Sequence, residues 1–164
     1  MKQALIAFLA LSLSACGFTP LYATDVSGSN MIEVEQINGR SGHSLRKALI
    51  QHLAPGLPGL EGPATLTTDL DDKLERLSLQ ADQAASRTDA VAEARYVLAF
   101  RGNAISGRVE AETSFLVPTT PYADIPAQID ATERAVAVLA RRITDDMRLK
   151  LAELGKSKAA DTGS

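Results

Sequence analysis

The 164-residue sequence has one cysteine, no tryptophan and few aromatic residues. A single cysteine cannot form a disulfide within the chain, and one thiolate is too few for a structural zinc site. Its 17 basic residues are outnumbered by 20 acidic ones, which argues against nucleic-acid binding, since domains that bind nucleic acids are strongly basic. The chain also lacks a glycine-rich phosphate loop and the HExxH and GxSxG motifs. We therefore expect no enzymatic activity, no metal site and no cofactor.

The only cysteine, Cys16, follows a short apolar run. The run covers residues 4–13, and its roughly ten residues fall well short of the roughly 20 that span a bilayer. The motif "LSAC" at 13–16 matches the bacterial lipobox, in which the thiol receives a diacylglyceryl group and the signal is cut before the cysteine. We predict a signal peptide over residues 1–15 and a lipid anchor at Cys16. The alternative is an ordinary signal peptide with a chance cysteine.

The rest of the chain divides by composition into three parts. Residues 16–30 are interpreted as the anchor and a polar linker, and residues 31–154 as one domain. The small, polar residues 155–164 predict a disordered tail.

The first half of the domain predicts a strand, a helix and an ambiguous segment. Ile32 and Val34 alternate with glutamates, as in a half-buried strand, and helical spacing begins at about Ser44, after a break at "NGRSG". A loop rich in proline and glycine follows at 54–63. Residues 64–85 fit a strand with a bend near residue 75 and also fit a helix, and the pattern alone leaves both open.

Residues 94–117 predict a β-hairpin. Apolar residues alternate with mostly polar ones along both halves, and "GNAISG" at 102–107 predicts the turn.

A long amphipathic helix is expected at about 124–154. Asp124 is the expected N-cap, Pro126 lies in the first turn, and Gly155 is the expected stop. Its predicted buried stripe is Ile129, Val136, Leu139, Ala140, Ile143, Met147, Leu151 and Leu154. These elements predict an α+β fold: a two-layer sandwich with an about four-stranded, mostly antiparallel sheet and two helices packed on one face.

Three stretches of the sequence carry a resemblance: "CGFTPLY" at 16–22, "RYVLAFRG" at 95–102 and "DATERAVAVLARRITDDMRLKLAEL" at 130–154. Together they resemble the lipopolysaccharide-assembly lipoprotein family, LptE, in its alphaproteobacterial form. The order of elements matches the family over residues 16–154. The charged segment at 69–90 departs from the family pattern.

This resemblance implies a non-catalytic outer-membrane lipoprotein. Such a protein sits on the periplasmic side, inside the lumen of the large β-barrel that inserts lipopolysaccharide into the outer leaflet. The implied partners are that barrel in a heterodimer, lipopolysaccharide, and the membrane through acylated Cys16. The alternative is a periplasmic-facing lipoprotein that binds a soluble ligand or acts as an inhibitor.

Two groups of residues are candidate contacts. Arginine suits phosphate, so Arg95, Arg101 and Arg108 of the hairpin, with Arg87 as a weaker member, are predicted to bind lipopolysaccharide. Arg95 and Arg101 are an even number of residues apart, which predicts that both lie on the outer face of the hairpin. The alternative to ligand binding is a solvated polar face that discourages aggregation through the sheet edge. On the last helix, Asp145 and Asp146 lie among the basic residues Arg141, Arg142, Arg148 and Lys150. This favours a mutually neutralised surface over the alternative, contact with the barrel or with lipid phosphates.

The apolar motif after the cysteine is the second group. Phe18, Pro20, Leu21 and Tyr22 are predicted to dock on the barrel wall, or alternatively to pack among lipid headgroups.

Overall fold

The computed structural model describes residues 32–77, 87–118 and 120–162. Six elements follow one another: β1 (Ile32–Val34), α2 (Gly39–Leu53), β2 (Ala64–Leu77), β3 (Arg87–Phe100), β4 (Asn103–Leu116) and α3 (Pro121–Thr162). Cys16, Phe18, Pro20, Leu21 and Tyr22 lie outside the described residues.

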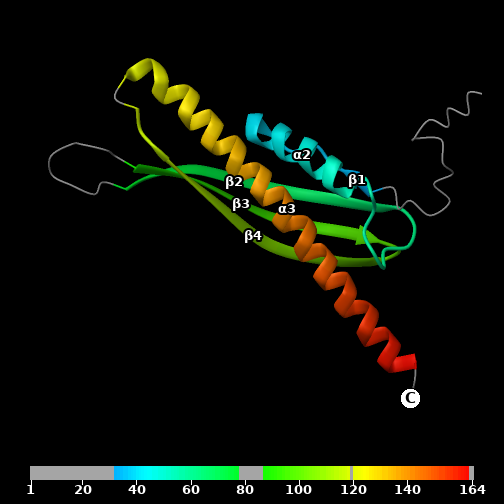
Figure 1. Ribbon diagram of the computed structural model, residues 1–164. Helices are drawn as coiled ribbons and strands as arrows, with labels where there is room; N and C mark the ends of the chain where they lie inside the picture. Colours follow the sequence, from blue (N-terminus) through cyan, green and yellow to red (C-terminus); the bar gives the residue numbers. More distant parts are fainter. Residues whose placement is uncertain (1–31, 78–86, 119, 163–164) are drawn as a thin grey trace, which may run out of the picture.

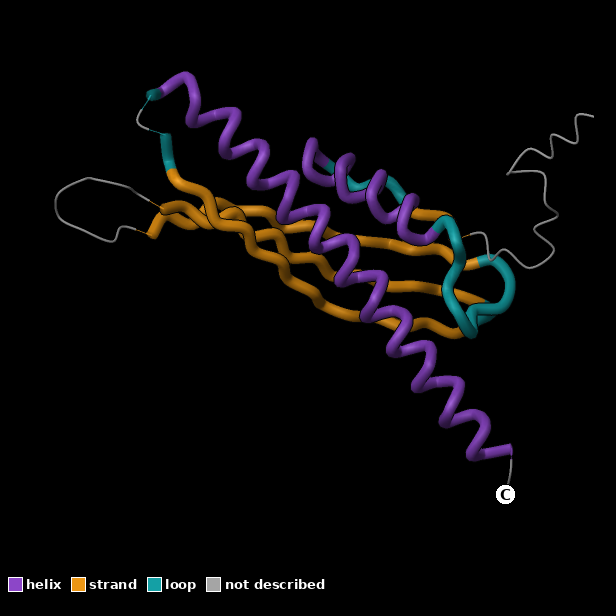
Figure 2. Tube along the Cα trace, in the orientation of Figure 1, coloured by secondary structure: helices purple, strands orange, loops and turns teal. Residues whose placement is uncertain are grey.

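The strands form one mixed sheet in the order β1-β2-β3-β4. β1 is parallel to β2 over three residue pairs, whereas β2, β3 and β4 are antiparallel along their full lengths. Both helices cover the same face of this sheet, and α3 crosses it diagonally, so that its C-terminal end extends past the strands (Figures 1 and 2). The predicted two-layer α+β fold is confirmed.

The core lies between the helices and the covered face of the sheet. Because successive side chains of a strand point to opposite faces, alternate residues of the strands enter it. Leu66, Tyr96 and Leu98 from the sheet are almost completely buried, together with Leu45 and Leu49 of α2. The predicted stripe of α3 is buried from Val136 to Leu151.

Several predicted boundaries are wrong. Helix α2 begins at Gly39, five residues before Ser44, and α3 begins at Pro121, so Asp124 lies in its first turn and is not the N-cap. Helix α3 continues through Gly155 to Thr162, so residues 155–162 are helical where a disordered tail was predicted. Leu154, predicted to be buried, is 46% exposed.

The hairpin turn is much shorter than predicted. Only Arg101 and Gly102 separate β3 from β4, and both have positive φ, +44° and +75°. Two positive φ values are typical of the tight turns that match the twist of antiparallel strands. "AISG" belongs to β4, and Gly107 lies opposite Tyr96 in the sheet.

The ambiguous segment is a strand from Ala64 to Leu77. Its pairing with β3 has no break at residue 75, so the expected bend is absent from this strand. The remainder, residues 78–86, lies outside the described residues.

Candidate binding face

Within the described ranges, no segment covers the face of the sheet opposite the helices, which is called the uncovered face (Figure 2). It is formed by alternate residues of β2, β3 and β4, among which Arg95 and Arg108 are direct cross-strand neighbours. Their side chains are 66% and 64% exposed. Side chains at opposite positions lie about 5 Å apart at Cβ, so both guanidinium groups can reach one ligand.

A carboxylate lies between these two arginines. Glu93 Oε2 accepts a hydrogen bond from Arg108 Nη2 at 2.5 Å, and Glu93 Oε1 lies 4.0 Å from Arg95 Nη2. The hydrogen bond from Arg108 and the nearby positive charges hold the pKa of Glu93 below its ordinary value. An anionic ligand must therefore compete with Glu93 for the arginines.

Arg101 does not lie on this face. It occupies the hairpin turn, and its guanidinium pairs with Glu61 at 2.8 Å. Arg101 is six positions along the chain from Arg95, or about 20 Å at 3.3 Å per residue. The prediction that both share the outer face is wrong because the chain leaves the strand at Phe100.

Arg87 lies at the opposite end of β3. It donates to Ser114 Oγ at 2.5 Å, and its Nε is 3.5 Å from Asp89 Oδ1. Eight residues, or about 26 Å of strand, separate it from Arg95. The four predicted arginines thus form one pair and two separate residues, each with an acidic partner.

Sequence reasoning missed the acidic character of the uncovered face. Neighbouring strands place Asp71 and Glu93 side by side, with Glu110 next to Glu93. Among the described residues, the other carboxylates of this face are Asp69, Glu75, Asp89 and Glu112, and its basic residues besides the arginine pair are Lys73 and Arg87. The sequence did carry a signal: Asp69, Asp71 and Glu75 are separated by even numbers of positions, as residues on one face of a strand are. The signal could be used only once this segment was known to be a strand.

Asp89 and Glu112 form a carboxyl pair within this face. Asp89 is only 6% exposed. A hydrogen bond from Ser114 lowers the pKa of Asp89 despite its burial, and the neighbouring Asp89 raises the pKa of Glu112. Glu112 is therefore the member of the pair that takes a proton first.

Beneath the covered face, a polar cluster joins α3 to the sheet. The Tyr96 hydroxyl donates to Asp146, whose Oδ2 also accepts from Lys150 Nζ at 2.8 Å. Lys150 donates in addition to the Ser106 carbonyl at 2.7 Å and lies 5.4 Å from the centre of the Tyr96 ring. Because these polar groups have partners and the tyrosine is buried, we interpret the cluster as structural: it holds α3 against the sheet.

The basic residues of α3 are paired with acidic residues only in part. Arg148 pairs with Asp145 at 3.1 Å and Lys150 with Asp146, whereas Arg142 donates to the Glu110 carbonyl at 2.6 Å. Within the described ranges, no group of three or more histidine, cysteine or acidic residues is arranged to hold a metal ion. No helix in the described part of the chain is long and apolar enough to cross a membrane.

The chain is similar to several solved protein structures. No family model and no curated protein matches the chain. A candidate lipoprotein from Caulobacter crescentus CB15 is 28% identical, with a TM-score of 0.54 over 74% of this chain and 90% of that protein.

Two more distant structures share the fold. Rare lipoprotein B from Shewanella oneidensis is 15% identical, with a TM-score of 0.57 over 77% of this chain and 99% of its own. A minor lipoprotein from Acinetobacter baumannii is 13% identical, with a TM-score of 0.56 over 74% and 94%. The chain therefore has the fold of solved bacterial lipoproteins.

Proposed function

We propose that this chain is an outer-membrane lipoprotein that plugs and helps to assemble the lipopolysaccharide-transport β-barrel. The observation that carries the proposal is the combination of the lipobox ending at Cys16 with a fold shared with bacterial lipoproteins. The β-barrel partner and the lipopolysaccharide ligand are those of the LptE family, which residues 16–22 resemble. Acyl chains at Cys16 would hold the domain at the membrane, since each buried methylene contributes about 0.8 kcal/mol.

In this proposal the protein acts by filling the lumen of the β-barrel. Lumens of large barrels are polar, so a plug must present polar surfaces to the wall while keeping its own core intact. The uncovered sheet face is polar and charged, and α3 carries ion pairs on its exposed side. Both faces of the domain are thus suited to a polar, enclosed environment.

Arg95 and Arg108 are the best-placed ligand residues within this proposal. A phosphate of lipopolysaccharide would displace Glu93 and accept hydrogen bonds from both guanidinium groups. Replacing both arginines by alanine should weaken binding of purified lipopolysaccharide about tenfold or more. The matched control is the Arg87→Ala/Arg101→Ala variant, which removes the same charge from distant positions and should change binding less than twofold. Equal losses in both variants would contradict a shared site.

The role itself is tested by purifying a C-terminally tagged full-length chain from its own envelope in mild detergent. We expect one large β-barrel protein at near equal amount, identified by mass spectrometry. Recovery of the lipoprotein alone, under conditions that keep other barrel complexes intact, would contradict the proposal. It would favour a periplasmic-facing lipoprotein that binds a soluble ligand or acts as an inhibitor.

A further inference from the structure

The edges of the sheet are protected unequally. Lys150 and Arg142 of α3 cap the carbonyls of Ser106 and Glu110 along β4. Arg46 of α2 likewise donates to the Val34 carbonyl of β1 at 3.0 Å. Capping of edge carbonyls by basic side chains hinders pairing with another strand.

In the described part of the chain, the edge of β2 lacks this protection beyond Leu66. β1 pairs with Ala64–Leu66, and the last bond from a described residue to this edge runs from the Glu35 N–H to the Leu66 carbonyl at 3.0 Å. The backbone N–H and C=O groups of successive residues point to opposite sides of a strand. The N–H and C=O groups of Thr68, Leu70, Asp72 and Leu74 therefore point to the same side as the Leu66 carbonyl. Among the described residues, no strand pairs with β2 here and no basic side chain caps it.

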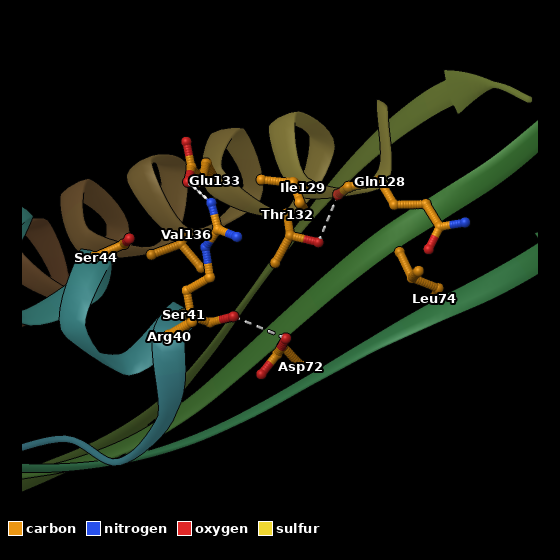
Figure 3. A pocket seen from close by; sticks show the side chains of 10 residues that line it. All are labelled: Arg40, Ser41, Ser44, Asp72, Leu74, Gln128, Ile129, Thr132, Glu133 and Val136. Atoms are coloured by element: carbon orange, nitrogen blue, oxygen red, sulfur yellow. Dashed lines mark hydrogen bonds and ion pairs between the residues drawn. The ribbon is translucent and has the colours of Figure 1, made fainter. Parts of the chain in front are cut away.

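A small cavity opens beside this unpaired edge, on the covered side of the sheet (Figure 3). Its volume is about 190 Å³, and it lies between the first turns of α2, the middle of β2 and α3. Leu74, Ile129 and Val136 supply its apolar lining, and Leu74 is 42% exposed. The ion pair between Arg40 and Glu133, at 3.3 Å, borders it. Small-molecule pockets measure roughly 300 Å³ or more, so this cavity suits a single apolar side chain.

The other side of the same edge is acidic. Asp69 and Asp71 are exposed on the uncovered face and form no ion pair with any described residue, whereas Lys73 is paired with Glu75 at 2.6 Å. An incoming strand would place alternate side chains on this face, where basic residues complement the two aspartates. A second copy of β2 is disfavoured, because it would bring the same carboxylates onto this acidic face.

We propose that the edge of β2 from Thr67 to Glu75 binds an extended segment of a protein partner in which basic and apolar residues alternate. The backbone of that segment pairs with β2, an apolar side chain enters the cavity beside Leu74, and basic side chains lie next to Asp69 and Asp71. The inference does not rest on the proposed function, because it uses only the edge, the cavity and the charges around them.

The test uses the full-length chain in detergent and a fluorescent seven-residue peptide of alternating lysine and valine. We expect the peptide to bind and to slow amide hydrogen exchange at Thr68, Leu70, Asp72 and Leu74, but not along β4. The Asp69→Asn/Asp71→Asn variant should bind it about tenfold more weakly at low salt, from the loss of two partly exposed ion pairs. The matched control, Glu110→Gln/Glu112→Gln, removes two charges from the same face at the far strand and should change affinity less than twofold.

Two backbone-methylated peptides separate strand pairing from simple charge attraction. One is methylated on the lysine nitrogens and the other on the valine nitrogens. Only one of these sets faces β2 in a paired strand, so one peptide should lose binding and the other should retain it. Absence of binding by the unmodified peptide, retention of binding by both methylated peptides, or equal weakening by both double variants would overturn the proposal.

Discussion

At the scale of single residues, Tyr96 is where the sheet and the long helix are joined by polar contacts. Its ring is buried in the core, and its hydroxyl reaches Asp146 of α3. This contact needs room on the neighbouring strand, and Gly107, opposite Tyr96, provides it. A Cβ at position 107 would lie 2.5 Å from Asp146 Oδ2, 2.6 Å from Lys150 Nζ and 2.6 Å from Tyr96 Cε1.

We predict that Gly107→Ala destabilises the protein by about 1–3 kcal/mol, the usual cost of overpacking a filled site. The measurement is the free energy of unfolding from urea titration followed by circular dichroism. Gly155→Ala is the matched control, because nothing lies within 4 Å of a Cβ there and alanine favours a helix. Equal stability of the Gly107→Ala variant and the wild type would contradict the packing described for Tyr96.

The same cluster predicts a dependence of stability on pH. Burial alone would raise the pKa of Asp146, but hydrogen bonds from Lys150 and Tyr96 outweigh it and hold this pKa below its ordinary value. A lowered pKa stabilises the fold above the ordinary carboxyl value of about 3.9, and the contribution is lost as the pH falls through the lower folded value.

Tyr96→Phe removes one of these bonds, so acid unfolding should begin at a higher pH than in the wild type. The pH of half-unfolding, followed by circular dichroism, measures the effect. Tyr122→Phe is the control, since Tyr122 is 96% exposed. An unchanged acid midpoint in Tyr96→Phe would contradict the role given to the hydroxyl.

At the scale of elements, α3 both covers the sheet and shields its edge. Arg142 reaches over β4 to the Glu110 carbonyl, while the adjacent Arg141 is exposed and forms no hydrogen bond or ion pair with any described residue. The two arginines differ in this contact, although they have the same charge and neighbouring positions.

We predict that Arg142→Ala increases self-association of the protein, because it frees a backbone acceptor on a long edge strand. Sedimentation in detergent solution gives the distribution of species. Arg141→Ala should leave that distribution unchanged, and similar behaviour of the two variants would show that charge, not capping, is responsible.

The sequence predicted the elements with strong periodicity and missed those defined by distant contacts. The apolar alternation around Tyr96 and the helical spacing from Val136 to Leu151 identified the correct buried faces. The turn was misplaced because Gly107 suggested a loop, whereas this glycine accommodates Tyr96 within a strand. The arginine pair was found, but its partner Glu93 became evident only from the cross-strand register.

At the scale of the whole molecule, the domain has two layers, with both helices on one side of the sheet (Figure 2). Ion pairs lie on both sides of it, such as Arg108–Glu93 on the sheet and Arg148–Asp145 on α3. A lipoprotein that binds its partner through one surface would leave the other in solvent. A plug inside a barrel is surrounded, and both sides meet the same wall. This difference separates the proposed role from its alternative more sharply than co-purification does.

Photo-crosslinking from opposite sides of the domain tests the central claim most directly. Val97, 44% exposed on the uncovered face, and Leu149, 66% exposed on the outer side of α3, would each be replaced by a photoreactive amino acid in the native envelope. The plug role predicts that both positions crosslink to one and the same large β-barrel protein. Crosslinks to that barrel from only one of the two positions, or from neither, would contradict it.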